Sequence, residues 1–209
     1  MAPARSPERR LRLVLLALVA IAAVALPAFA IGRISVLLAS DPGTTSAEAG
    51  YARDMQTHHD QGVEMAMIVR DRTEDEAVRT LAYDIARTQG QQSGQLYGWL
   101  TVWGVPQAGS GPPMQWMADD EHAHAAAAST AMPGLATPQQ VEELRAASGV
   151  DAERIFLRLM IAHHQGAVEM SEAVLARTSE PVVQSFARAV VTSQESEATL
   201  MEEMLAERS

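Results

Sequence analysis

Apolar residues recur along most of this chain at intervals of three and four, the spacing of amphipathic α-helices. The pattern predicts four long helices, over residues 46–72, 73–103, 151–177 and 180–207. Thr73 and Asp151 are the predicted N-caps of the second and third helices. The stretch 104–150 is rich in Gly, Pro and Ala, with short helices expected around residues 115–128 and 137–149. We therefore predict an all-α protein.

The two halves of this helical part are related by an internal duplication. An offset of 105 residues places His163 on His58 and Met160 on Met55, and the match continues without a gap through the following helix. The repeated units and the crossover between them are residues 48–103, 151–207 and 104–150. Two helical hairpins joined by one long crossover are typical of a ferritin-like four-helix bundle, the fold predicted for residues 48–207.

The N-terminal region predicts a membrane anchor or a signal peptide. Residues 1–12 form a basic, cytoplasmic segment, and residues 13–31 form an uncharged apolar run close to the length of a membrane-spanning helix. The positive flank predicts a single-pass protein of the cell membrane with its C-terminal domain outside the cytoplasm. The alternative is a signal peptide cleaved near Ala30 and a secreted protein. Residues 32–47 follow as a polar linker.

The amino-acid composition excludes several kinds of site and ligand. The chain has no cysteine, so disulfides, thiolate metal sites and cysteine nucleophiles are excluded. Residues 1–33 hold five of the 16 basic residues and one acidic residue, which leaves residues 34–209 with 25 acidic and 11 basic side chains. An acidic domain of this kind attracts cations and repels nucleic acid. Nucleic-acid binding is therefore not expected.

Paired histidines flanked by methionines occupy the inward stripe of each hairpin. Imidazole nitrogens and thioether sulfurs are the donors that soft and borderline transition metals prefer, which favours copper, as Cu(I) or Cu(II), over other divalent metals. The candidate metal ligands are Met55, His58, His59, Met65, Met160, His163, His164 and Met170. A single buried histidine or methionine is usually ordinary core packing, but two His-His pairs at matching positions indicate a functional layer.

A second set of polar residues is expected at the same level of the bundle. Counting outward from each hairpin turn sets Gln89 and Gln92 beside the first histidine pair, and Gln194 and Glu197 beside the second. Amides and carboxylates of this kind orient the rings of metal-binding histidines through hydrogen bonds. A polar layer of this size is costly to bury unless a ligand or a closed hydrogen-bond network satisfies it.

The third histidine pair lies on the crossover and defines a candidate second metal site. Its members are His122 and His124, with Met114 and Met117 nearby. A His-x-His motif with neighbouring methionines can chelate copper or zinc. The alternative is a solvated loop without a ligand.

The histidine-methionine sequence resembles a known family. The segment Met160–Met170, preceded by Phe156-Leu157 and by Met132-Pro133-Gly134, resembles the signature of the domain of unknown function 305 family, and both halves of residues 48–207 match. The resemblance implies a ferritin-like bacterial protein that is commonly exported or membrane-anchored. It also implies copper as the metal, because some members are implicated in copper binding, and it carries over the eight ligands named above.

Two departures from the family pattern affect the site. Leu135 stands where the family often has a second methionine, three residues after Met132, which weakens the crossover as a methionine-rich site. Asp60 replaces the glutamine that follows the second histidine pair. The two halves therefore need not bind metal equally.

Three functions compete at this point. The favoured one is an exported protein that binds copper and sequesters it or hands it to a metal-accepting partner in the cell envelope. The first alternative is a helical scaffold or interaction module whose buried His/Gln layer only fixes the register of the bundle. The second is a ferritin-like dimetal oxidase, which is disfavoured because none of the four long helices has the Glu-x-x-His motif of such centres. The sequence leaves the oligomeric state open.

Overall fold

The structure is a computed structural model that describes residues 7–38, 41–118 and 132–208, and every regular element in these ranges is helical. The prediction of an all-α protein is confirmed. The chain divides into two compact units, Met1–Asp41 and Pro42–Ser209.

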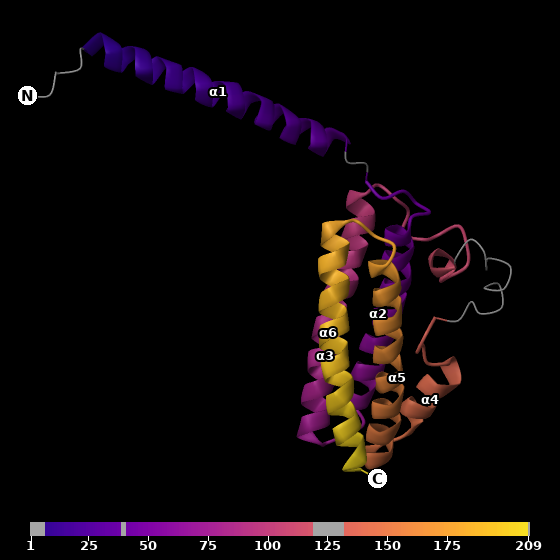
Figure 1. The fold of residues 1–209 in the computed structure, drawn as a ribbon. Coiled ribbons are helices and arrows are strands. Elements are labelled where there is room, and N and C mark those ends of the chain that lie inside the picture. The colour runs from indigo at the N-terminus through magenta and orange to yellow at the C-terminus, as the bar shows by residue number, and fades with distance from the viewer. Residues whose placement is uncertain (1–6, 39–40, 119–131, 209) are drawn as a thin grey trace, which may run out of the picture. The chain divides into compact units, whose positions relative to one another are not determined.

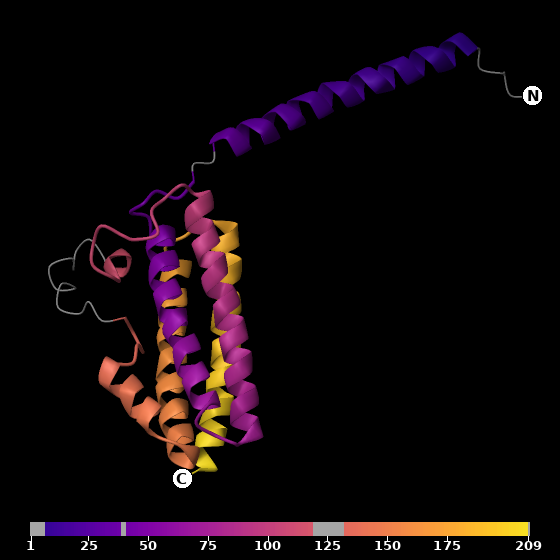
Figure 2. The same ribbon diagram turned by 180° about the vertical axis from the view of Figure 1, so that it is seen from behind.

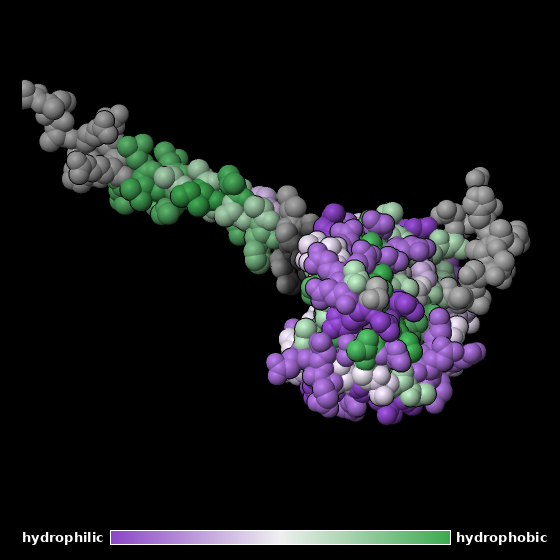
Figure 3. Space-filling model, turned by 90° about the horizontal axis from the view of Figure 1, so that it is seen from below, coloured by the Kyte–Doolittle hydropathy of each residue, from purple (hydrophilic) through white to green (hydrophobic). Residues whose placement is uncertain are grey.

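The first unit contains one long apolar helix, α1 (Pro7–Leu38). Its segment Leu11–Ala30 is long and apolar enough to cross a membrane, and none of it is buried. Figure 3 shows apolar side chains over the visible face of α1, whereas the visible end of the second unit is mostly hydrophilic. The helix continues past the predicted apolar run of residues 13–31 into the segment predicted as a linker.

The second unit is a bundle of four long helices with short helical segments in the crossover (Figures 1 and 2). Its elements are α2 (Ala47–Arg70), α3 (Glu76–Val102), η1 (Gln115–Met117), α4 (Pro138–Ala146), α5 (Gly149–Leu175) and α6 (Pro181–Ala206). Helix α2 packs against α3, α5 packs against α6, and the two hairpins meet along α2 and α5. Helix α4 and η1 lie against α2 and α5.

Two predicted N-caps are wrong, that of α3 by two residues and that of α5, which is Ser148, by three. Helix α3 is capped by Asp75, whose carboxylate accepts a hydrogen bond from Val78 N. The Thr73 hydroxyl instead donates to the carboxylate of Glu153. Helix α5 begins at Gly149 rather than at Asp151. Gly149 has a φ of 57°, a conformation that glycine adopts without steric cost.

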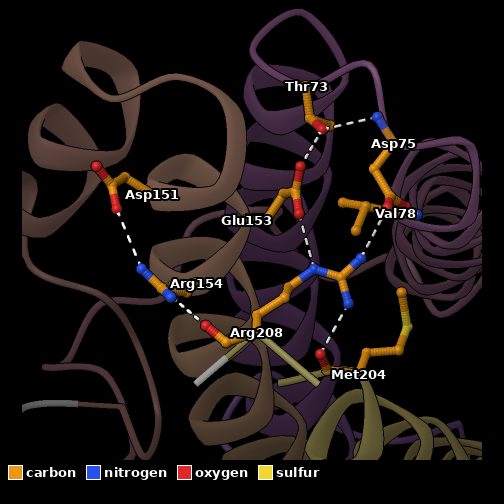
Figure 4. A network of polar contacts seen from close by, with 8 residues as sticks. All are labelled: Thr73, Asp75, Val78, Asp151, Glu153, Arg154, Met204 and Arg208. Carbon is orange, nitrogen blue, oxygen red and sulfur yellow. Dashed lines mark hydrogen bonds and ion pairs between the residues drawn. The ribbon is translucent and has the colours of Figure 1, made fainter. Parts of the chain in front are cut away.

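An ion-pair network, in which Glu153 is buried and Asp75 is partly exposed, ties helix ends together (Figure 4). The Arg208 guanidinium donates from Nε to Glu153 at 2.7 Å and lies 3.0 Å from the Asp75 carboxylate. Its Nη1 also donates to the Met204 carbonyl at 2.7 Å. The network therefore joins the α2–α3 turn, the start of α5 and the end of α6.

The apolar core consists of two clusters. The first, which we call the α4-side cluster, includes Met65, Leu144, Phe156 and Met160. The second, the η1-side cluster, is built from the other ends of the same long helices and contains the buried residues Tyr51, Met55, Leu96, Leu100, Met170, Phe186 and Val190. Four histidines and three glutamines are buried in the same helices but belong to neither cluster. They form a polar layer within the bundle.

Candidate metal centre

The two histidine pairs meet inside the bundle. His58 and His59 on α2, and His163 and His164 on α5, all have no solvent-exposed surface. The rings of His58 and His163 stack, with 3.8 Å between their centroids and 29° between their planes. The two stacked histidines occupy matching positions, 105 residues apart, in the two hairpins.

Close approach of the helices at this layer depends on Gly62. A Cβ atom at this position would lie 2.1 Å from Gln89 Oε1 and 2.8 Å from His163 Cε1, well inside van der Waals contact. Gln89, on α3, is only 2% exposed. Gly62 therefore leaves the space in which the Gln89 amide and the His163 ring pack.

Three of the histidines make one hydrogen bond each, always through Nε2. His58 Nε2 lies 3.0 Å from the Pro133 carbonyl oxygen, and His163 Nε2 lies 2.7 Å from the His58 carbonyl oxygen. His164 Nε2 lies 2.7 Å from a carboxylate oxygen of Glu197. Because a carbonyl oxygen can only accept, the proton of His58 and of His163 is on Nε2, which leaves Nδ1 of both rings with a free lone pair.

These lone pairs belong to a larger set of unpaired atoms. Among the described residues, no hydrogen-bond partner is found for Nδ1 of His58, His163 and His164, for either ring nitrogen of His59, for both amide atoms of Gln89 and Gln194, or for Gln92 Oε1. Leaving a buried polar atom unpaired costs on the order of 1–3 kcal/mol. Such an accumulation of unpaired donors and acceptors in one layer is expected where a ligand completes the site.

The surroundings keep His58, His59 and His163 neutral. Burial lowers the pKa of His58 to about 4, although the Pro133 carbonyl partly opposes the shift. Burial, followed by the proximity of His58, holds the pKa values of His59 and His163 well below the usual range. The Gln92 amide opposes this shift at His59 without reaching hydrogen-bonding geometry. Neutral imidazole is the form that binds metal.

The crossover covers the layer at the α2–α5 interface. Besides the contact of Pro133 with His58, the Gln61 side chain binds both the N–H and the C=O of Ala136, at 2.7 and 2.8 Å. A Cβ on Gly166 would lie 2.0 Å from the Pro133 carbonyl oxygen. Gly134 has a φ of 70° and leaves equally little room against Ala162. Sequence analysis missed the roles of Gln61 and of the Pro133 carbonyl.

The predicted methionine ligands lie in the two apolar clusters rather than in the polar layer itself. Met55 and Met170 belong to the η1-side cluster, and Met65 and Met160 belong to the α4-side cluster; all four are fully buried. The predicted orienting residues Gln89, Gln92 and Gln194 are buried on α3 and α6, whereas the Glu197 side chain is 28% exposed.

Only part of the candidate second metal site lies within the described residues. Met114 is buried and Met117 is half-buried, while His122 and His124 lie outside the described residues. The start of the crossover is held by Asp54, whose carboxylate accepts hydrogen bonds from Met114 N at 2.7 Å and Trp116 Nε1 at 2.8 Å. Burial raises the pKa of Asp54. Among the described residues, no group of three or more His, Asp or Glu is arranged to hold a metal as it stands.

Fold and site together define a helical-bundle protein with a buried histidine layer. Residues 48–205 match the family described as Domain of unknown function (DUF305), and the chain belongs to that family. A DUF305 protein from Streptomyces coelicolor shares 47% sequence identity at a TM-score of 0.72, over 79% of this chain and 96% of its own. A DUF305 fragment from Deinococcus radiodurans shares 34% identity at a TM-score of 0.63, over 77% and 96%.

The same fold occurs in CopM. The Cu(I)-bound form of CopM has a TM-score of 0.59 and 21% identity, over 78% of this chain and 96% of CopM. No curated protein matches the chain. None of these relatives is named as an enzyme.

Proposed function

We propose that this protein binds copper in its histidine layer and sequesters the ion or hands it on in the cell envelope. The observation that carries the proposal is the shared orientation of His58, His163 and His164. Each turns Nε2 to a carbonyl or carboxylate oxygen and leaves Nδ1 unpaired. Metal-binding histidines typically use one nitrogen for the metal and the other for an orienting oxygen.

The donor set fits copper better than harder cations. The layer supplies imidazole nitrogens from His58, His59, His163 and His164, and the two apolar clusters on either side supply the thioethers of Met55, Met65, Met160 and Met170. Thioether sulfur suits Cu(I), and imidazole suits both oxidation states of copper, while other divalent metals compete mainly for the nitrogens. Gln89, Gln92, Gln194 and Glu197 would hold the rings in place.

The relatives support this assignment. CopM, which shares the fold, is known in Cu(I)-bound, Cu(II)-bound and Ag-bound forms. An acidic bundle also raises the local concentration of cations. We propose that Met114, Met117, His122 and His124 form a second copper site that captures or transfers the ion.

We further propose that the bundle works outside the cytoplasm, anchored by α1. The relative from Streptomyces coelicolor is described as a secreted protein, which supports export. The apolar segment Leu11–Ala30 has the length and composition of a membrane-spanning helix, and its basic N-terminal flank predicts an N-terminus on the cytoplasmic side. A protein that accepts the metal would then meet the bundle in the envelope.

The test is a titration of the full-length chain, in neutral detergent, with Cu(I) and Cu(II) against a competing chelator. Wild type should bind at least one ion tightly, and His58→Ala with His163→Ala should weaken binding by more than about 100-fold. The matched control is Leu96→Ala with Val190→Ala. It truncates two fully buried apolar residues of the η1-side cluster and should retain copper binding despite lower stability.

A structural role for the same layer has its own support. His58 and His163 bind backbone carbonyls, and the His58–Pro133 contact fixes the crossover on the bundle. If the layer serves only register, wild type will bind no copper above surface association. The histidine variants would then change stability alone.

A further inference from the structure

A groove of about 370 Å³ runs along the bundle between α5 and α6 and reaches the histidine layer. Its inner lining includes His164, which has no exposed surface, and Gln194, which is 2% exposed. Both amide atoms of Gln194 and Nδ1 of His164 lack partners among the described residues. The exposed carboxylates Glu195 and Glu202 also line it. The groove thus leads from an acidic part of the surface to buried polar atoms that have no hydrogen-bond partner.

The duplication provides an internal comparison for this groove. Gln165 and Ala198, which line it, correspond through the 105-residue offset to Asp60 and Ser93 of the first hairpin. There the Ser93 hydroxyl donates to the Asp60 carboxylate at 2.6 Å and ties α3 to α2. Neither side chain of the Gln165/Ala198 pair can reproduce that bond, because alanine has no hydroxyl. The seam of the first hairpin carries this Asp–Ser latch, whereas the second lacks it and is joined near this level by the His164–Glu197 hydrogen bond instead.

The charge of the two seams differs in the same sense. Glu195 and Glu202 take the places of Gly90 and Tyr97 in the first hairpin. Asp60 of the first hairpin, in turn, stands where the second has Gln165, so the second seam carries two carboxylates against one. A cleft lined by charges of one sign concentrates counter-ions and raises their association rate by about 10- to 1,000-fold. The acidic seam is therefore the one suited to collect a cation.

Glu197, which is not among the residues that line the groove, places a further carboxylate against the buried layer. Its carboxylate binds His164 Nε2 at 2.7 Å while 28% of its side chain remains exposed. The corresponding residue of the first hairpin is the neutral Gln92, which is 9% exposed. A negative side chain thus reaches from solvent to a candidate ligand only in the second hairpin.

We infer that the α5–α6 groove is the entrance through which a copper ion reaches the histidine layer, with Glu195 and Glu202 as its outer cation-binding groups. The inference rests on the proposed copper-binding function. An entrance speeds both entry and exit, so closing it slows loading and release together and leaves the equilibrium affinity unchanged. A ligand substitution, in contrast, changes the affinity.

The experiment measures stopped-flow loading of the full-length chain, in neutral detergent, with Cu(II) chloride, followed by quenching of tryptophan fluorescence. Gln165→Asp with Ala198→Ser copies the latch of the first hairpin into the second. It should slow loading and release together relative to Gln165→Asp alone, which adds the same charge without the serine hydroxyl at position 198, and leave the dissociation constant within about threefold of that single variant's. Circular dichroism checks that the variant folds.

A surface variant keeps the test decisive if the latched variant does not fold. Glu195→Gln with Glu202→Gln should slow loading by about tenfold and reduce its dependence on salt. The matched control, Asp84→Asn with Glu172→Gln, removes the same charge at exposed positions away from the groove. It should load at close to the wild-type rate.

The outcomes separate the two claims. If wild type binds copper but the latched and charge variants load at the rates of their controls, the groove is not the entrance and only this inference is overturned. If wild type binds no copper, the proposed function fails and the inference fails with it.

Discussion

Lowering the pH should destabilise the metal-free bundle, because its histidine layer resists protonation. In the folded protein the pKa values of His58, His59 and His163 lie below the usual value, so the unfolded chain takes up protons first. The contribution of these histidines to the free energy of unfolding is then fully present above the unfolded pKa of 6.5. It is lost as the pH falls from there toward the folded pKa values.

The size of the effect follows from His58, which is fully buried. Its pKa of about 4, against 6.5 in the unfolded chain, gives a loss of about 2 kcal/mol between pH ~7.5 and pH ~5. His59 and His163 contribute in the same direction. Asp54 contributes in the opposite direction, because burial raises its pKa: its contribution is fully present below 3.8, is lost as the pH rises through the raised pKa, and so can only reduce the net loss.

The assay is urea unfolding of the full-length chain in neutral detergent with a chelator present, at several pH values across this range. Tryptophan fluorescence reports on the bundle alone, because all three tryptophans lie in the second unit. His58→Gln cannot titrate here and should reduce the pH-dependent loss by about 2 kcal/mol. A wild-type stability that is flat across the range, or an unchanged slope in His58→Gln, would refute the reasoning.

Two further predictions concern packing and charge. Gly62→Ala should destabilise the bundle by about 1–2 kcal/mol, because its Cβ collides with Gln89 and His163; the control Gly98→Ala, with nothing within 4 Å of the added Cβ, should stabilise it by up to about 1 kcal/mol. Chemical denaturation measures both changes in the free energy of unfolding. Equal effects at the two glycines would contradict the close approach of Gln89 and His163 to Gly62. Arg208→Ala should cost about 3 kcal/mol by leaving Glu153 buried without its cation, whereas Arg145→Ala, which breaks an exposed pair, should cost less than about 1 kcal/mol. Similar losses in both arginine variants would argue against a stabilising network at the helix ends.

The helices and the histidine layer could be predicted from the sequence because both depend on local periodicity. A three- and four-residue spacing fixes which face of α2 and α5 is buried, and the duplication makes the two faces meet at matching residues. For this reason the periodicity and the repeat together predict that His58 and His163 lie at the same level of the bundle. Their role as metal ligands remains a prediction.

The wrong and missed features all depend on contacts between distant segments. Thr73 has the sequence context of an N-cap, but its hydroxyl donates to Glu153, 80 residues later in the chain, and Asp75 caps α3 instead. The contacts of Pro133 with His58 and of Ala136 with Gln61 depend on the path of the crossover, which no periodicity encodes. Contacts of backbone carbonyls in particular cannot be predicted from the types of side chain, because every residue has a carbonyl.

Residues at matching positions of the two hairpins make different contacts. In the first hairpin, Gln61 binds the crossover and the Asp60–Ser93 hydrogen bond latches the seam. In the second, Gly166 occupies the place of Gln61 and admits the Pro133 carbonyl. The crossover thus closes the layer at the α2–α5 interface, and the latch ties the seam between α2 and α3. The acidic α5–α6 groove reaches the layer from the side that neither of them covers. Exchanging residues between matching positions of the two hairpins can therefore separate the residues that cover the histidine layer from those of the proposed entrance.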